Sequence, residues 1–113
     1  MKRLTVAALA MLSACAQTPK EVVETGMKTR HQLGQPARAD ECIARNAENL
    51  HPAFTVQTRD RDGEPEVVVR NTRGDNATIA VVKIQRTESV ADLWLSQNVM
   101  GKKALLDALV AGC

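Results

Sequence analysis

Between residues 54 and 96 the chain carries β-branched runs separated by turn sequences, and this pattern constrains the fold more than any other feature. Residues 77–86 form the clearest run, because β-branched side chains suit the pleated surface of a strand. Asp62-Gly63 is a favoured hairpin turn, and Arg73-Gly74-Asp75-Asn76 supplies another turn. The pattern predicts a four-stranded antiparallel meander with strands at residues 54–60, 66–71, 77–86 and 90–96.

The last of these segments has an alternative interpretation. Ser89-Val90-Ala91-Asp92 resembles a capping box, in which a Ser or Thr side chain and an acid three residues later close the first turn of a helix. A helix through Trp94 is therefore the alternative to the fourth strand.

Helical periodicity flanks the strands on both sides. Residues 37–50 place their apolar side chains on one stripe, formed by Ala39, Cys42, Ile43, Ala47 and Leu50. Residues 100–111 form a second stripe, with Leu105, Leu106, Leu109 and Val110. Each stripe needs an apolar surface to cover. We therefore expect an α+β fold, a two-layer sandwich in which an N-terminal helix and a C-terminal helix cover one face of the meander.

The first 15 residues have the arrangement of an export signal. Lys2 and Arg3 precede an apolar stretch over residues 4–12, and Leu12-Ser13-Ala14-Cys15 then places small residues before a cysteine. The stretch is too short to cross a bilayer, which takes about 20 apolar residues. This N-terminus resembles the lipobox of bacterial lipoproteins, where signal peptidase II cuts before a cysteine already joined to a diacylglycerol. An ordinary signal peptide that is cut elsewhere is the alternative.

The lipobox resemblance implies where the protein is held. Residues 1–14 would be the lipoprotein signal peptide, and Cys15 would carry palmitate-type acyl chains, of which two or more give stable membrane anchoring. Ala16 resembles the residue found after the cysteine in lipoproteins exported to the outer membrane, whereas Asp there would indicate inner-membrane retention. The resemblance therefore implies anchoring to the bacterial outer membrane on its periplasmic side.

The content of large hydrophobic residues rises after Pro36, and this change divides the exported chain into two parts. Residues 15–36 contain few large hydrophobic side chains, and we interpret them as the lipidated N-terminus and a flexible tether. A short docking strand at residues 22–28 is the alternative. Residues 37–113 form one small domain, of a size at which a single core is marginal.

Cleavage before Cys15 changes both the charge and the cysteine count. The full chain has 15 basic and 13 acidic residues, and loss of Lys2 and Arg3 leaves 13 of each, so no basic excess favours nucleic acid. With Cys15 assigned to lipid, Cys42 and Cys113 form an even pair in an oxidising setting. Their bond would close a loop of about 72 residues and stabilise the domain by roughly 4 kcal/mol. A free or intermolecular thiol at Cys113 is the alternative.

A second resemblance covers the domain itself. Three segments look like parts of small proteobacterial lipoproteins of unassigned function: Cys42-Ile43-Ala44-Arg45-Asn46-Ala47-Glu48, Leu93-Trp94-Leu95-Ser96, and Leu105-Leu106-Asp107-Ala108 with Gly112-Cys113. This resemblance implies the same disulfide and architecture. It implies no chemistry.

Residues that could carry catalysis lack the spacing that catalysis needs. His31 and His51 show no metal-ligand spacing, so we expect neither a metal nor a cofactor. Ser89 and Ser96 lack the Gly-x-Ser-x-Gly context of a hydrolase nucleophile. We therefore expect that the protein is not an enzyme.

These observations favour a non-enzymatic, lipid-anchored periplasmic module that binds another component of the cell envelope, with a protein as the expected partner. The expected interaction surface is the uncovered sheet face, with Trp94, Val90, Arg70 and Arg86. Arg73 would serve an inhibitor lipoprotein that inserts a hairpin side chain into a wall-degrading enzyme. A small cell-wall-acting enzyme and a structural spacer are the rival functions.

Overall fold

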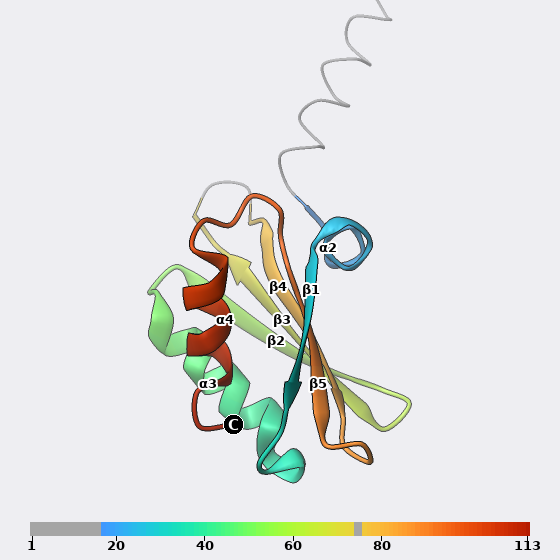
Figure 1. Cartoon of the computed structure of the whole chain (residues 1–113). Helices are drawn as coiled ribbons and strands as arrows, with labels where there is room; N and C mark the ends of the chain where they lie inside the picture. Colours follow the sequence, from blue (N-terminus) through green and yellow to red (C-terminus); the bar gives the residue numbers. More distant parts are fainter. Residues whose placement is uncertain (1–16, 74–75) are drawn as a thin grey trace, which may run out of the picture.

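The computed structural model describes residues 17–73 and 76–113. Cys15, the signal sequence and the Gly74-Asp75 part of the second turn lie outside the described residues. The chain forms an α+β fold built on one sheet of five antiparallel strands, in the order β1-β5-β4-β3-β2 (Figure 1). The strands are β1 (Met27–Gln32), β2 (Phe54–Arg61), β3 (Glu64–Asn71), β4 (Thr78–Gln85) and β5 (Val90–Leu95).

The predicted meander is present as β2, β3, β4 and β5. Asp62 and Gly63 join β2 to β3, with φ of 54° and 82°, which is the backbone that Asp-Gly hairpin turns require. Residues 90–95 form a strand, and the alternative helix is wrong. The expectation of four strands was also incomplete, since β1 adds a fifth beside β5, with Met27 opposite Leu95 and Gln32 opposite Val90.

Helices α3 (Ala39–Leu50) and α4 (Lys102–Val110) cover one face of the sheet, which we call the inner face. A short 3-10 helix, η1 (Pro36–Arg38), leads directly into α3. Both helices follow the predicted apolar stripes, although α4 is shorter than expected. Ile43 and Leu109 are fully buried with Leu93 of β5, and each such burial stabilises the fold by about 1.5–3 kcal/mol.

A disulfide joins Cys42 of α3 to Cys113, just after α4, and this confirms the predicted pairing. Asn46 reinforces the same junction, because its Nδ2 donates to the carbonyl oxygens of Leu109 and Ala111 at 2.8 and 2.9 Å. The two helices of the inner layer are therefore tied together by both covalent and polar contacts.

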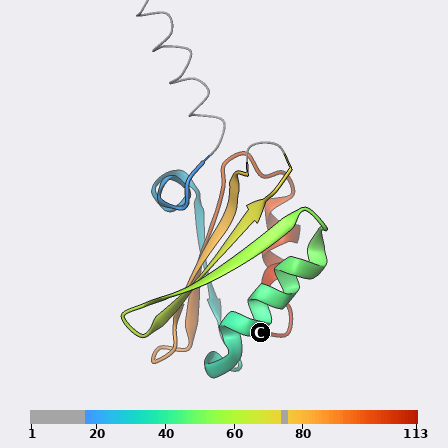
Figure 2. The same ribbon diagram turned by 180° about the vertical axis from the view of Figure 1, so that it is seen from behind.

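Most of the segment expected to be a flexible tether is instead part of the folded domain. Pro19–Thr25 form helix α2, and β1 follows it in the sheet. The alternative docking strand at residues 22–28 was also misplaced, because the strand begins only at Met27. α2 lies on the side of the sheet opposite α3 and α4 (Figures 1 and 2), so this part of the molecule has three layers.

Local sequence explains why α2 forms. Thr18 caps it, its Oγ1 accepting a hydrogen bond from the amide of Glu21 at 3.2 Å, and Pro19 occupies the first turn. Thr18-Pro19-Lys20-Glu21 thus has the sequence of a capping box, with proline where its missing N–H costs least. After α2, Gly26 brings the backbone so close to β5 that a Cβ would overlap the carbonyl oxygens of Leu95 and Val22.

This close approach predicts that Gly26→Ala destabilises the domain. Because the neighbours are backbone atoms, the added methyl should cost about 1–3 kcal/mol of unfolding free energy, as overpacking of a tight site does. Urea denaturation measures the change. Gly34→Ala is the matched control, since a Cβ there meets nothing closer than the Cys113 carbonyl oxygen at 3.7 Å. Equal stability of the two variants would contradict the docking of residues 17–32.

Candidate functional site

The face of the sheet opposite α3 and α4, which we call the outer face, carries a row of charges that crosses all five strands. Strand register places one residue of each strand opposite the next, and the signs alternate from edge to edge. The row runs Arg30, Asp92, Lys83, Glu66, Arg59. Opposite charges directly across antiparallel strands attract, so this row supports the register of the whole sheet.

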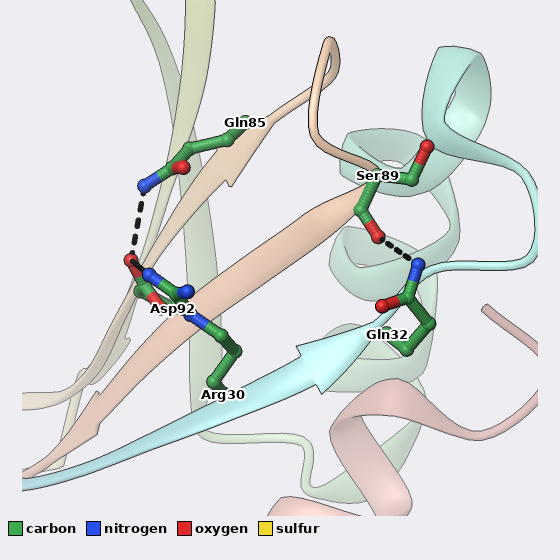
Figure 3. Close-up of polar contacts among 5 residues, drawn as sticks. All are labelled: Arg30, Gln32, Gln85, Ser89 and Asp92. Atoms are coloured by element: carbon green, nitrogen blue, oxygen red, sulfur yellow. Dashed lines mark hydrogen bonds and ion pairs between the residues drawn. The ribbon is translucent and has the colours of Figure 1, made fainter.

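At the β1 side of the row, three strands converge on Asp92. Arg30 Nε donates to Asp92 Oδ1 at 2.8 Å, and Gln85 Nε2 donates to Oδ2 at 3.1 Å (Figure 3). Asp92 is buried, but the hydrogen bond from Arg30 outweighs that burial and lowers the pKa of its carboxyl. Asp92 is therefore held ionised, as the polar centre that joins β1 to β4 and β5.

Hydrogen bonds also join the C-terminal end of β1 to the turn before β5. Gln32 Nε2 donates to the Ser89 carbonyl oxygen at 3.0 Å (Figure 3), and the amide of Leu33 donates to the same oxygen at 2.8 Å. These contacts hold the last residues of β1 on the turn before β5. Together with the contacts of Asp92, they hold β1 against β5 along its length.

At the β2 side of the row, Glu66 forms ion pairs with two arginines. Arg59 Nη2 lies 2.5 Å from Glu66 Oε1, and Arg61 Nε lies 3.9 Å from Oε2. Arg59 Nε is buried and has no hydrogen-bond partner among the described residues. Arg70 lies close by on β3, where its Nη1 donates to Gln57 Oε1 at 3.0 Å, a neutral partner.

An apolar strip lies beside the charges on the outer face. Val68 and Val81 pair across β3 and β4 and are buried, although they point away from the main core. α2 packs over this part of the sheet, with Val22 fully buried. Trp94 continues the strip on β5, between the ammonium groups of Lys28 and Lys83, which lie 5.3 and 5.4 Å from its ring centroid.

Between α2 and the outer face lies an open groove of about 520 Å³. Its charged lining has five cationic side chains and two acidic ones, which gives the groove a net positive charge. We call it the cationic groove. It is lined by Thr18, Pro19, Lys20, Val23, Glu24, Arg59, Arg61, Glu66, Arg70, Val81 and Lys83.

The residues expected to form the interaction surface do not gather as one patch. Trp94 and Arg70 are on the outer face, and only Arg70 lines the groove. Val90 also faces outward but is buried. Arg86 instead reaches the inner layer, where its Nη2 lies 3.3 Å from Asp40 Oδ1 at the start of α3. The outer face is also less open than expected, because α2 covers part of it.

Arg73 is exposed just after β3, and its amide donates to Asn71 Oδ1 at 3.0 Å. His31 and His51 lie apart, on β1 and after α3. Within residues 17–73 and 76–113, no group of three or more His, Cys, Asp or Glu side chains is arranged to hold a metal ion. No helix in that part of the chain is long and apolar enough to span a membrane.

Sequence reasoning missed most of the groove. The predicted strand ended at residue 60, which left Arg61 outside it, and neither Arg59 nor Arg61 was expected in an interaction surface, yet both belong to β2 and line the groove. The available signal was the strand alternation of β2, in which charged residues at positions 59 and 61 share one face. Lys20 and Glu24 had no such signal, because they depend on the docking of α2.

Comparisons with protein-family models, with curated proteins and with solved structures found no match.

Asp92→Asn should lower the free energy of unfolding at pH 7 by about 1–3 kcal/mol, because it removes a buried, charged hydrogen-bond acceptor. The pKa of Asp92 is lower in the folded chain than in the unfolded chain. Its contribution is therefore complete above about pH 5 and is lost as the pH falls through the folded-state pKa. Urea denaturation of both proteins between pH 7 and pH 2 should show the difference shrink toward acid.

Asp62→Asn is the control for this variant. Asp62 is exposed in the β2–β3 turn, and asparagine also tolerates its positive φ. If Asp92→Asn and Asp62→Asn behave alike at pH 7, Asp92 has no structural role in joining the strands.

Proposed function

We propose that this protein is a lipid-anchored periplasmic binding module, held on the outer membrane through Cys15, that binds an acidic segment of another envelope protein in the cationic groove. The groove is the observation that carries the proposal. It is an open cleft between two elements of the fold, and it gathers like charges that a folded domain would otherwise separate.

Pairing within the groove supports an anionic partner. Glu66 is already engaged by Arg59 and Arg61, while within the described residues the side chain of Arg70 donates to a neutral amide and forms no ion pair. Lys20 lies 4.0 Å from Glu24, a distance at which an exposed pair contributes little. Guanidinium groups form bidentate hydrogen bonds with carboxylates, so an acidic segment could engage the side chains that Glu66 does not satisfy.

The shape of the groove favours a peptide segment over a small molecule. Small-molecule pockets are mostly apolar and enclose their ligand, whereas this groove is open and lined chiefly by charged residues. Val23 and Val81 supply an apolar floor between the charges, which suits a chain that alternates acidic and apolar side chains.

The carboxylates on the outer face support binding over hydrolysis. A glycoside hydrolase needs a general acid with a raised pKa beside a second carboxylate. The pKa of Asp92 is lowered, and Glu66 forms ion pairs with two arginines. Both acids therefore suit the support of the sheet better than proton transfer.

Lipid attachment has its own test. Cys15→Ser should abolish incorporation of labelled palmitate and leave an uncut precursor, because the proposed anchor chemistry needs that thiol. Metabolic labelling and the mass of the purified protein measure both effects. Continued acylation of the variant would remove Cys15 as the anchor.

A photo-crosslinker placed at Val23 tests the groove in intact cells. We expect one dominant protein adduct, whose acidic segment is identified by mass spectrometry of the crosslinked peptide. Arg70→Glu should reduce the adduct about tenfold, since reversal of one interfacial charge costs on the order of 1–2 kcal/mol. Arg45→Glu, an exposed position on α3, is the matched control and should change nothing.

Three other results would redirect the function. An equal adduct in both variants would place the partner outside the groove. The absence of any adduct would favour the structural spacer. An adduct with a wall-degrading enzyme that depends on Arg73, and not on Arg70, would favour the inhibitor.

A further inference from the structure

The chain joins the domain at one end of the sheet, which we call the proximal end. The amide of Thr78, the first residue of β4, donates to the Gln17 carbonyl oxygen at 3.0 Å. Ser96, just after β5, donates through its Oγ to Gln17 Oε1 at 2.6 Å. Gln17 is thus fixed to the domain by both its backbone and its side chain.

Gln17 is two positions after Cys15, with only Ala16 between them. An extended chain spans roughly 3.3–3.6 Å per residue, so the two Cα atoms are at most about 7 Å apart. If Cys15 carries lipid, as the proposed function holds, no long spacer lifts the domain from the bilayer. The proximal end must therefore lie at the membrane surface.

The exposed hydrophobic side chains lie in segments that reach this same end. Within the described residues, three large hydrophobic side chains are exposed: Met27, Leu50 and Met100. Met27 begins β1 opposite Leu95, and Leu50 ends α3 shortly before β2 begins. Met100 lies in the loop between β5 and α4 and is 93% exposed. The exposed apolar side chains are therefore carried by segments that begin or end at the proximal end, and Met100 is by far the most exposed of them.

Hydrogen bonds hold the β5–α4 loop in shape. Lys102 Nζ donates to the carbonyl oxygens of Val99 at 2.8 Å and Gln97 at 3.3 Å. Gln97 Nε2 donates to the Thr25 carbonyl oxygen at 2.7 Å, which ties the loop to the end of α2. Met100 therefore projects from a braced loop, and it does not gain burial by folding back onto the domain.

Charge around Met100 suits an anionic lipid surface. Residues 97–103 contain Lys102 and Lys103 and no acid. Lysines beside an inserted hydrophobic side chain are attracted to anionic headgroups. A methionine with basic neighbours, on the end of the domain nearest the lipidated cysteine, matches the chemistry of a membrane-contacting loop.

We propose that the proximal end rests on the phospholipid surface, with Met100 inserted among the headgroups and Lys102 and Lys103 beside anionic lipids. This inference rests on the lipid anchor of the proposed function and goes beyond it, because it gives the domain a fixed orientation. The strands then run outward from the bilayer, and the cationic groove opens to the side, along the membrane surface.

The test uses the full-length protein with a single substitution, Met100→Cys. Cys42 and Cys113 are joined in the disulfide and Cys15 is acylated, so an environment-sensitive thiol dye labels position 100 alone. The labelled protein is placed in vesicles of phosphatidylethanolamine and phosphatidylglycerol. We expect a blue-shifted emission and a several-fold lower quenching by an aqueous quencher than in the control. The control is Glu88→Cys, an exposed position in the turn at the opposite end of the sheet.

Three outcomes overturn the inference. The mass of the protein shows whether Cys15 is acylated, and so distinguishes failure of the membrane contact from failure of the anchor. Equal quenching at positions 100 and 88, with Cys15 shown to be acylated, overturns the membrane contact and leaves the lipid anchor standing. The second outcome is a dye that is protected at high protein density and becomes accessible to the quencher when the lipid-to-protein ratio is raised. That result overturns the membrane contact, because a second copy of the chain then covers position 100. A protein without acyl mass on Cys15 removes the proposed anchor, and the inferred orientation with it.

Discussion

Valines on both sides of the central strands require that the sheet be covered on both of its faces. Val67 and Val82 point into the core beneath α3 and α4, while Val68 and Val81 point the opposite way and are equally buried. A two-layer sandwich would leave the second pair in water. α2 packs on β4 and β5 on that side, so a helix from the N-terminal segment completes the cover of the sheet that the two inner helices begin.

This requirement explains which parts of the fold the sequence predicts. The meander, both inner helices and the Cys42–Cys113 bond follow from turn sequences, apolar stripes and the pairing of cysteines. α2 and β1 were missed because their segment contains few large hydrophobic side chains and β1 reads Met-Lys-Thr-Arg-His-Gln without an apolar alternation. Two signals could have found them: the capping box at Thr18 and the three consecutive valines of β3, which indicate a strand buried on both faces.

The candidate site was predicted less completely for a related reason. Trp94 and Arg70 were placed on the outer face by strand alternation alone, whereas Arg86 leaves the strand at a turn and reaches Asp40. Which cations gather in the groove depends on the order of the strands and on the docking of α2. Neither is encoded in local periodicity. The alternating row from Arg30 to Arg59 exists only once the register of all five strands is set.

The pairing of β1 with β5 has a consequence for the order of folding. β2, β3 and β4 each pair with the next strand along the chain, so the meander closes by short hairpins, whereas Met27 meets Leu95 across most of the domain. Closing so long a loop costs more chain entropy before any contact offsets it. The meander should form first and offer β5 as a template for β1. The N-terminal segment then completes the sheet last, which brings the proposed lipid attachment point to its final position only after the rest of the domain is in place.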